Sequence, residues 1–548
     1  MALKHKPVEM PSKRVTFKKA PNGNGTIYAY YTVRAYRNKK GKPTSDEVAI
    51  GKRDPETGML IPNRRYFEIF GDENEPTKPI NSSSNTSAKP IQQLQYEVAS
   101  YGESYLLRHI TREMKLDAVL ADAAPRLWEK LLAIAFYMVS NGNVMMYISD
   151  WFDETNIEFT EPFDDRRCGE IFETIDRQMQ MRFFESWVKQ RAENEYIAYD
   201  VTSVSTEANI DIAEWGYNRD GEKMPQVNIG MFFGSKTRMP VYYDMYNGSI
   251  ADKAYLFTMM ENAKILGITN VRYVMDQGFL TGDNLTYMQE NEHYFVTALP
   301  KHLIESRRLI DESKDMIRKS ANRLVDYGIY AVIGETTIID GCKMTAHIYF
   351  DPEKQHQDEK TLFAHIDGLK QDLEKMSKSK PASKRYTDFF DVNQDKPEGL
   401  EFNMDHDKID KVLSRTGFFV LLSNDDKLSS EEVLSIYRNK DVVEKGFAQL
   451  KNEVDFSRLR THVNETTNGK VFVGFIALII RSYLMNRIKG HPETKKMTLG
   501  KVLSELRKIK IITVNGIKTA LTPLTKQQRL ILSTCFHISF DDFSHSLS

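Results

Sequence analysis

Apolar and polar residues alternate along residues 15–70, which indicates short β-strands separated by turns. Residues 26–34 are rich in β-branched and aromatic side chains, and Asn22 with Gly23 is a typical turn sequence. Residues 71–92 are polar, rich in proline and serine, and poor in apolar side chains. We therefore expect a β-rich N-terminal module over residues 1–70 and a linker over residues 71–92.

The pattern becomes helical after the linker. Apolar residues recur at helical spacing between residues 106 and 120, and the spacing repeats between residues 127 and 139. Residues 93–194 are therefore expected to form a helical domain.

From residue 195 the pattern is that of strands alternating with helices. Strands are expected at residues 196–200, 226–233, 239–244, 271–276 and 294–299, and helices at residues 252–266 and 281–291. The order β-β-β-α-β-α-β is that of a ribonuclease-H-like α/β domain, in which the first and fourth strands end side by side. Residues 195–301 are therefore expected to be the first part of such a core.

A long insertion separates this part from the rest of the core. The pattern predicts a basic helix at residues 304–324, strands at residues 329–339 and 343–350, and a charged helix at residues 362–376. This is too much structure for a loop, so residues 302–415 are expected to form an inserted, partly β subdomain. The core resumes over residues 416–490 with a strand and an acidic helix, and residues 491–548 are expected to be a basic C-terminal helical region. The fold class is multidomain α/β.

Composition adds little to this organisation, but the distribution of charge does. The 548 residues are 41% hydrophobic and 28% charged, with a net charge of -1, which is near the globular average. Residues 1–70 carry fifteen Lys and Arg against six Asp and Glu, and residues 481–529 carry twelve against two. Such local excesses are candidate phosphate-contacting faces. Ordinary solvated surface is an equally good explanation of any single basic cluster.

Several features bear on the location of the protein. The three cysteines, Cys168, Cys342 and Cys535, lie far apart and form no CxxC pair, which argues against a zinc site and for a reducing compartment. The basic N-terminus lacks the apolar core of a secretory signal. The longest apolar run, residues 471–480, is too short to span a bilayer and predicts a buried helix. We expect a cytoplasmic protein with no membrane partner.

Three acidic residues stand in positions that suit metal-dependent chemistry. Asp200 and Asp276 end predicted strands, and Glu444 lies in a predicted helix. Two strand-end carboxylates and one on a helix can hold a pair of divalent cations about 3.5–4 Å apart, as metal-assisted phosphoryl transfer requires. The acids therefore predict a metal-dependent enzyme that cuts and rejoins DNA. The structural alternatives are turn-forming aspartates and a surface glutamate paired with a lysine.

Glu444 belongs to a polar stripe. On a continuous helix Tyr437, Lys440, Glu444 and Lys451 fall within about 60° of one another, beside an apolar stripe that would dock on the sheet. Asp441 and Glu444 also have the spacing of a capping box. An alternative is therefore a helix that restarts at Asp441 and leaves Tyr437 and Lys440 on the preceding turn.

Two other residues near the acids have a structural interpretation. Trp215 lies in the polar excursion after Asp200, where it is expected to pack against other side chains rather than stack on an extruded base. Asp252 is expected to cap a helix or a turn.

Together, these motifs resemble the DDE transposases of bacterial cut-and-paste insertion sequences. The resemblance is to the branch with the signature Y-x2-R-x3-E-x6-K after a β-rich insertion, and it covers about residues 100–490. Tyr437, Glu444 and Lys451 match the signature, and Asp200 and Asp276 match its two aspartates.

One position departs from this signature. Lys440 stands where the family usually has arginine. It keeps the charge and loses the planar, bidentate grip on phosphate, which affects the expected contact with the DNA end rather than the metal site.

The resemblance implies that the three acids, which are Asp200, Asp276 and Glu444, hold two Mg²⁺ ions, for which Mn²⁺ would substitute. It implies cleavage at the inverted repeats of the transposon ends, hairpin formation on the excised ends, and strand transfer into target DNA by a homodimer in a synaptic complex. The DNA-binding residues would be Tyr437, Lys440 and Lys451. The N-terminal module and the helices of residues 93–150 would read the end sequence.

Two other functions remain open from the sequence. One is a catalytically inactive or domesticated DNA-binding protein of the same fold, which the intact acids oppose and Lys440 favours. The other is a stand-alone metal-dependent nuclease, which would cleave without preference for an end sequence.

Overall fold

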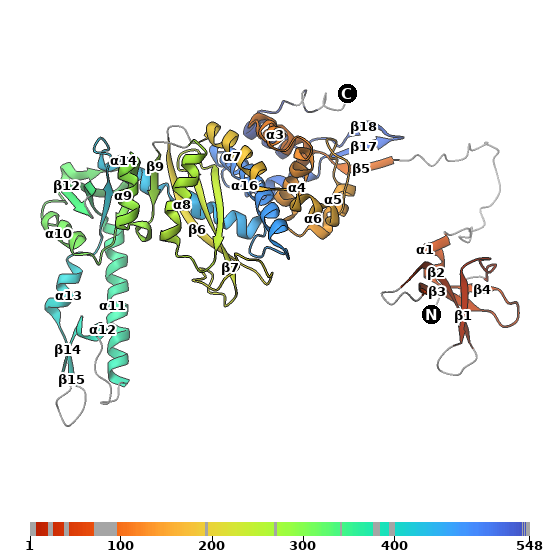
Figure 1. Cartoon of the computed structure of the whole chain (residues 1–548), viewed down its shortest axis with the longest axis horizontal. Coiled ribbons are helices and arrows are strands. Elements are labelled where there is room, and N and C mark those ends of the chain that lie inside the picture. The colour runs from red at the N-terminus through yellow and green to blue at the C-terminus, as the bar shows by residue number, and fades with distance from the viewer. Residues whose placement is uncertain are drawn as a thin grey trace. The chain divides into compact units, whose positions relative to one another are not determined.

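The computed structural model describes residues 7–19, 26–37, 43–70, 96–191, 195–267, 271–339, 342–375, 384–393, 401–539, 541 and 543. The chain divides into two compact units, Met1–Gln93 and Leu94–Ser548, which Figure 1 shows with their helices and strands labelled. The linker predicted for residues 71–92 lies outside the described residues. The large unit mixes helices with a long mixed sheet, which confirms the predicted multidomain α/β class.

In the N-terminal unit, the described residues form a four-stranded antiparallel sheet and one helix. The elements are β1 (Val15–Lys19), β2 (Ile27–Arg37), β3 (Pro43–Arg53), β4 (Leu60–Pro62) and α1 (Arg64–Phe70). Its small core contains Ala29, Ile50 and Leu60, with Tyr66 of α1 packed against them. Gly51 is required where β3 meets β4, because a Cβ there would lie 2.3 Å from the carbonyl oxygen of Ile61.

The large unit begins with a strand and a helical layer. The elements are β5 (Tyr96–Ser100), α2 (Gly102–Glu113), α3 (Leu116–Ala123), α4 (Trp128–Asn141), η1 (Met145–Tyr147), α5 (Ile148–Glu154), α6 (Asp165–Glu173) and α7 (Arg177–Arg191). These helices pack on the long helix α16 (Asn464–Gly490), against which α4 and α6 lie. The described part of this predicted domain, residues 96–191, is thus mainly helical apart from β5.

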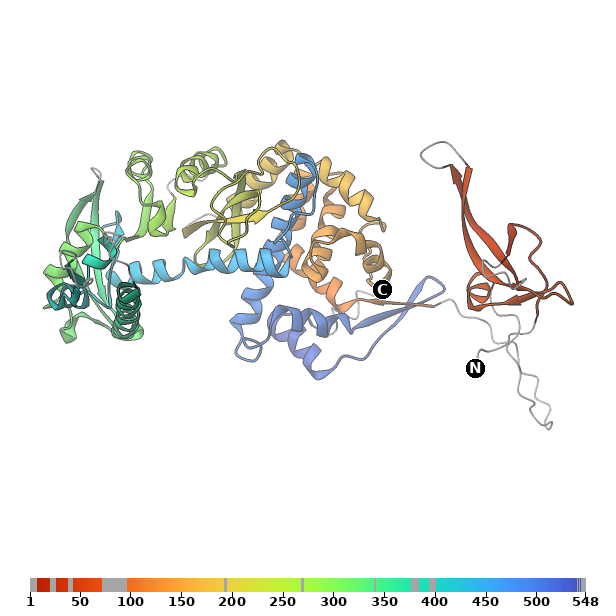
Figure 2. The same ribbon diagram turned by 90° about the horizontal axis from the view of Figure 1, so that it is seen from below.

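The C-terminal region differs from the helical prediction for residues 491–548. Its elements are α17 (Leu499–Arg507), β17 (Lys510–Val514), β18 (Ile517–Leu521), α18 (Lys526–Leu530) and η6 (Ile531–Cys535). Strands β17 and β18 form a hairpin that pairs with β5 (Figure 2). The turn residues Asn515 and Gly516 both have positive φ, 52° and 77°. Asn-Gly is a typical hairpin signal, and here it overrides the helical pattern on which the prediction rested.

The main sheet organises the rest of the large unit. Within the described residues its nine strands follow the order β11-β12-β13-β16-β10-β9-β6-β7-β8. Strands β6 (Tyr196–Ser205), β7 (Gln226–Gly234) and β8 (Pro240–Asn247) are antiparallel neighbours, whereas β9 (Arg272–Met275) and β10 (Tyr294–Leu299) continue the sheet parallel to β6. Between them lie α8 (Asp252–Ile265), η2 (Gln277–Phe279) and α9 (Gly282–Glu290).

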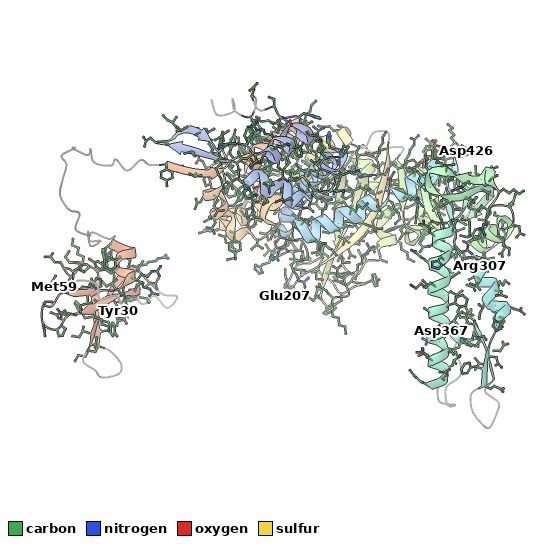
Figure 3. The ribbon with its side chains drawn as sticks, turned by 180° about the vertical axis from the view of Figure 1, so that it is seen from behind. Tyr30, Met59, Glu207, Arg307, Asp367 and Asp426 are labelled. Carbon is green, nitrogen blue, oxygen red and sulfur yellow. The ribbon has the colours of Figure 1, made fainter. Side chains whose placement is uncertain are left out.

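The strands predicted for the insertion extend this same sheet. β13 (Cys342–Phe350) pairs with β16 (Phe418–Ser423), which in turn pairs with β10. The remaining elements of this part are α10 (Ile304–Ser313), η3 (Ser320–Asn322), β11 (Arg323–Leu324), η4 (Val325–Tyr327), β12 (Ile329–Ile339), α11 (Pro352–Lys375), α12 (Lys384–Thr387), β14 (Phe390–Asn393), β15 (Glu401–Met404) and α13 (His406–Leu413). The basic helix expected at residues 304–324 ends at Ser313 as α10. The outer elements gather around α11 in a core of their own, beside Asp367 in Figure 3.

After β16 come α14 (Ser430–Arg438), α15 (Asp441–Ala448), the π-helical turn η5 (Gln449–Glu453) and α16. Residues 471–480 of α16 are all buried, as predicted. By length and composition, α16 is long and apolar enough to cross a membrane, and 78% of its most apolar window is buried inside the protein. Among the described residues, Trp128–Asn141 with Met145–Glu154 passes the same test only as a pair bent by 101°. A buried core helix meets these criteria without crossing a membrane.

Candidate active site

The two aspartates are neighbours on adjacent strands. The parallel pairing of β6 with β9 places Tyr199 opposite Met275, and Asp200 and Asp276 are the next residue on each strand. Adjacent strands lie about 4.8 Å apart, so both carboxylates reach the same region of the sheet. The predicted meeting of the first and fourth strands is therefore confirmed by the strand register.

The prediction that Asp200 ends its strand is wrong. Strand β6 continues to Ser205 because its next residues pair with β7, from Val201 opposite Gly230 to Ser205 opposite Gln226. It is β9 that stops, at Met275, and the Asp276 carboxylate accepts a hydrogen bond of 2.8 Å from the backbone N–H of Gln277. Asp276 thus also caps a turn, which was its structural alternative.

Glu444 reaches the site on a broken helix. Helix α14 ends at Arg438 and α15 begins at Asp441, as the capping-box alternative predicted, and the light-blue helices follow one another in Figure 2. The capping box itself forms elsewhere, between Ser429 and Glu432 at the start of α14. Lys440 keeps helical angles, φ -62° and ψ -22°. The polar stripe therefore keeps a common direction across the break.

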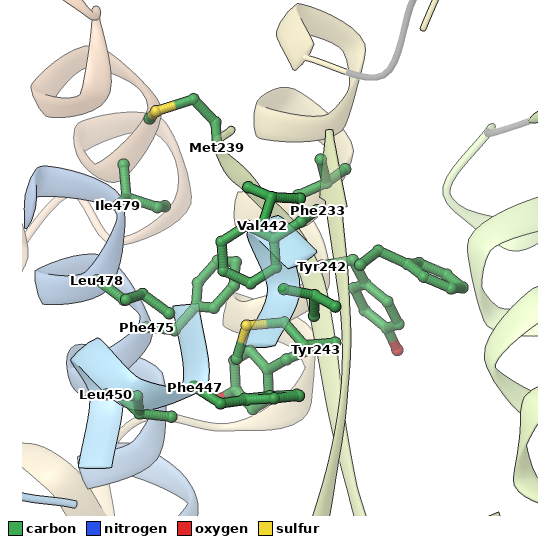
Figure 4. Close-up of a cluster of buried hydrophobic side chains, with 14 of the residues drawn as sticks. Phe233, Met239, Tyr242, Tyr243, Val442, Phe447, Leu450, Phe475, Leu478 and Ile479 are labelled. Carbon is green, nitrogen blue, oxygen red and sulfur yellow. The ribbon is translucent and has the colours of Figure 1, made fainter. Parts of the chain in front are cut away.

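Close packing holds α15 against the sheet. Val442 and Phe447 are buried and lie among side chains of β7, β8 and α16 in Figure 4, where Phe233 is labelled. Gly446 faces this ring: a Cβ at Gly446 would lie 2.2 Å from Cζ of Phe233. A glycine two residues after Glu444 thus allows α15 to approach the sheet closely enough to present its glutamate.

The polar stripe meets the acids through its cation and its phenol. Lys440 Nζ lies 3.3 Å from Glu444 Oε1 and 3.9 Å from Asp276 Oδ1. The Tyr437 hydroxyl donates a hydrogen bond of 3.4 Å to Asp276 Oδ1. The structure therefore brings four of the six predicted site residues into one chain of contacts.

Asp200 interacts electrostatically with Lys440 and Glu444. It also forms an ion pair with Arg219, a residue that the sequence did not reveal as part of the site. Arg219 donates from one guanidinium nitrogen to Asp200 Oδ1 at 3.2 Å and from the other to Asp252 Oδ2 at 2.6 Å. The Asp252 carboxylate also accepts a hydrogen bond of 2.8 Å from Tyr246. Its expected role as a cap is wrong, because the N-cap of α8 is Ala251 and no side chain forms a cap hydrogen bond there. Arg219 lies in the irregular excursion between β6 and β7, where no periodicity marks a residue as functional.

Lys451, the last residue of the stripe, contacts the same excursion. Its Nζ lies 2.6 Å from Asp220 Oδ2, and its side chain is 13% exposed. Asp220 directly follows Arg219 in the chain. Lys451 therefore contacts the segment that carries Arg219 rather than one of the three acids.

The electrostatic environment favours cations at this site. Burial raises the pKa of Asp200, and the Glu444 charge acts in the same direction, while Arg219 and Lys440 oppose both. Burial also raises the pKa of Tyr437 well above its usual value, with a further contribution from Asp276. Burial acts to lower the pKa of Arg219, but Asp200 and Asp252 outweigh it and raise that pKa. The two cations thus neutralise part of the negative charge of the acids.

A cavity of about 580 Å³ opens beside the acids. Asp200, Asp276, Arg219 and Asp252 all line it, together with Tyr217 of the excursion. The side chain of Tyr217 is 83% exposed. The excursion between β6 and β7 therefore forms part of the solvent-exposed wall of the cavity.

Trp215, two residues before Tyr217, was expected to be packed. It is 66% exposed, so that expectation is wrong. The indole lies on the solvent side of the excursion, where a partner molecule can reach it.

The donor set fits divalent metal ions in its chemistry but not in its present geometry. Carboxylate oxygens are the ligands that Mg²⁺ prefers in proteins. Among the described residues, however, no three His, Cys, Asp or Glu side chains lie close enough together to hold a metal ion. Lys440 and Arg219 are bound to the oxygens that would be ligands, so metal binding requires these ion pairs to open.

The fold and the site define a multidomain α/β protein in which two aspartates lie on adjacent strands of a mixed sheet and Glu444, on helix α15, is linked to one of them through Lys440. Over residues 191–480 the sequence matches the family described as "Transposase DDE domain". This is more than half of the chain, and the chain belongs to this family of transposases.

Two further comparisons add little to this assignment. Among solved structures, the chain is similar to a piggyBac transposase in a synaptic complex with hairpin DNA, determined by cryo-electron microscopy. The identity is 12% and the TM-score 0.35, over 74% of this chain and 76% of that chain. A likeness of this size supports no argument about this chain. No curated protein matches it.

Proposed function

We propose that this transposase cuts DNA at the ends of an insertion sequence and joins the freed ends to target DNA, with Mg²⁺ as its cofactor. The observation that carries the proposal is the strand register that sets Asp200 beside Asp276, with Glu444 linked to Asp276 through Lys440. The order β8-β7-β6-β9-β10 supports a ribonuclease-H-like relationship for this part of the sheet. The tyrosine, glutamate and lysine spacing of residues 437–451 supports the bacterial insertion-sequence branch.

Each residue of the site has a distinct role in this proposal. Asp200, Asp276 and Glu444 would hold two divalent ions, and Mn²⁺ would replace Mg²⁺. When bound, such ions activate a water or a DNA 3′-hydroxyl and stabilise the leaving oxygen. Tyr437 and Lys440 would hold backbone phosphates beside the scissile bond once Lys440 has left the acids.

Lys451 would steady the excursion through Asp220, and it would contact the DNA backbone with its remaining hydrogen-bonding capacity. The exposed Trp215 and Tyr217 would lie against the DNA next to the site. The partners would be double-stranded transposon ends and target DNA, bound by a homodimer in the bacterial cytoplasm near the nucleoid.

The test uses the purified protein and a supercoiled plasmid that carries this gene with its native flanks. The plasmid is incubated with Mg²⁺, with Mn²⁺ or with EDTA, and every break is mapped by sequencing. We expect breaks at two inverted sequences that require the metal and are lost in Glu444→Gln. Asp441→Asn is the matched control, because Asp441 lies in the same helical turn and is bound to Lys445 rather than to the acids.

The remaining outcomes separate the alternatives. Scattered, metal-dependent breaks would indicate a stand-alone nuclease. Sequence-specific binding without any break, in either metal, would indicate an inactive DNA-binding protein of the same fold. Full activity of Glu444→Gln would remove the carboxylate centre from the mechanism.

A further inference from the structure

The N-terminal sheet has two chemically different faces. Opposed residues on antiparallel strands share a face, and Val15 lies opposite Tyr31 on the side that packs against Tyr66 of α1. Phe70 of α1 also contacts Tyr31, with ring centroids 5.0 Å apart. Helix α1 therefore packs against one face of the sheet, and the alternate residues of β1 and β2, such as Lys18 and Tyr28, project from the other face.

The second face carries lysines and tyrosines in register. Lys18 lies opposite Tyr28 and Tyr28 opposite Lys52, which forms one row across three strands. Thr16 and Tyr30 form the next row. The two lysines are exposed and the two tyrosines half-buried, and Tyr30 is labelled in Figure 3. We call this lysine–tyrosine face the outer face of the N-terminal sheet.

Each lysine rests on a tyrosine ring. Lys18 Nζ lies 4.8 Å from the centroid of the Tyr30 ring, and Lys52 Nζ lies 5.6 Å from that of Tyr28. A cation–π contact positions an ammonium group without neutralising it. The rings thus hold both lysines above the sheet, where Lys18 also forms an ion pair with Glu47.

We infer that the outer face binds the phosphate backbone of double-stranded DNA. A single strand would need open ring faces on which to stack its bases, whereas here lysines lie over the rings of Tyr28 and Tyr30. A sheet is one of the elements that proteins place in a DNA groove. Charge complementarity agrees, since residues 1–70 carry fifteen Lys and Arg against six Asp and Glu.

One acid on this face opposes the inferred binding. Glu47 lies opposite Thr32, and its carboxylate is 2.7 Å from Lys18 Nζ. The Lys18 end of this ion pair is exposed to solvent, which screens the attraction between the two charges, so a phosphate can displace Glu47. Removal of this acid should therefore strengthen DNA binding, which a merely structural role for Glu47 does not predict.

The experiment measures binding of the full chain to a labelled duplex of about 30 base pairs, and to one of its strands, in EDTA over a range of salt. Lys18→Gln/Lys52→Gln should bind the duplex about tenfold more weakly. The slope of log affinity against log salt should fall by about two, since each lost phosphate contact removes about 0.9. Glu47→Gln should bind the duplex more tightly than the unchanged protein.

The matched control is Arg64→Gln/Arg65→Gln, which removes the same charge from α1 on the opposite face. Equal losses in the two double variants would overturn the inference, because net charge alone would then explain binding. Weakening confined to the single strand, or no gain in Glu47→Gln, would overturn it as well.

The inference rests on the proposed function only in taking DNA as the partner, and the two fail separately. The binding assay contains no metal and scores no cleavage. Glu444→Gln should bind the duplex like the unchanged protein while it loses cleavage.

Discussion

Two sheets of this protein carry positively charged side chains, but their partners differ: carboxylates at the main sheet and tyrosine rings at the N-terminal sheet. At the main sheet Arg219 bridges Asp200 and Asp252, and Lys440 bridges Asp276 and Glu444. At the N-terminal sheet Lys18 and Lys52 rest on tyrosine rings.

The two sheets differ in how far the positive charge of these side chains is neutralised by their neighbours. A cation shared by two carboxylates is neutralised and must be displaced before the acids can bind metal. A ring does not neutralise the cation above it, so Lys52 can bind a phosphate directly, and Lys18 can do so once its ion pair with Glu47 opens. The first arrangement suits a centre that is completed on demand, and the second suits a permanent DNA contact.

The largest expected effect is at the acids. Asp200→Asn should lower metal-dependent cleavage by roughly 10³-fold, as the loss of one preorganised electrostatic group can, and should leave duplex affinity unchanged. Asp211→Asn is the control, since Asp211 lies in the excursion that follows β6 and is bound to Asn464 rather than to Arg219. Parallel cleavage assays and binding isotherms provide the measurement. A variant that still cleaves would end the distinction between the two sheets.

Each sheet depends on one closely packed glycine, so the two sheets can be perturbed independently. Gly446→Ala would place a Cβ 2.2 Å from the buried Phe233 ring, and Gly51→Ala would place one 2.3 Å from the Ile61 carbonyl oxygen. Overpacking of this kind costs about 1–3 kcal/mol. We expect the first variant to lose cleavage with normal duplex affinity, and the second to lose duplex affinity. Thermal unfolding should accompany both assays, and loss of the same activity in both variants would contradict the comparison.

Release of one cation should expose the acids. Arg219→Gln should bind Mn²⁺ about fivefold more tightly above neutral pH, because the metal no longer competes with an ion pair of about 1 kcal/mol. Titration calorimetry without DNA measures this directly. Arg458→Gln is the control, since Arg458 is bound to Glu222 and not to the acids. Weaker binding by Arg219→Gln would mean that the arginine supports the site instead of closing it.

The same variant should change the pH dependence of metal binding. Protonated Asp200 cannot be a ligand, so affinity falls as the pH drops through its pKa. Burial raises this pKa and Arg219 opposes the rise, so Arg219→Gln should lose Mn²⁺ at a higher pH than the unchanged protein. Mn²⁺ titrations between pH 4.5 and 8 would show the shift, and superimposable profiles would exclude this role.

The smallest expected effect concerns the rings of the N-terminal sheet. Tyr30→Leu removes a cation–π contact of about 0.5–1 kcal/mol, so duplex affinity should fall about two- to fivefold. Tyr30→Phe keeps the ring and should bind like the unchanged protein. Equal losses in both variants would assign the effect to the hydroxyl instead of to the ring.

Part of this arrangement could be anticipated from local sequence patterns. The order of strands and helices in the sequence predicted that Asp200 lies next to Asp276, because residues of neighbouring parallel strands lie side by side. Helical spacing placed Tyr437, Lys440 and Glu444 on one stripe, which survives the break between α14 and α15.

Other parts depend on contacts that no local pattern encodes. Arg219 and Asp252 enter the site from an irregular excursion and from the start of a helix, neither of which has a periodicity that points to the acids. The pairing of β17 with β5 joins residues 510–514 to residues 96–100. Neither segment contains a sequence pattern that predicts which strand it pairs with.

The sequence by itself indicated the family, the three candidate acids and most of the strands and helices of the large unit, although not the hairpin of β17 and β18. Residue spacing settles these features, because spacing decides which side chains share a face. The tertiary structure alone decided that Arg219 and Lys440 form ion pairs with the acids, that Lys451 contacts Asp220, and that Trp215 is exposed. Those features depend on where irregular segments come to lie, and that follows from the packing of the whole unit.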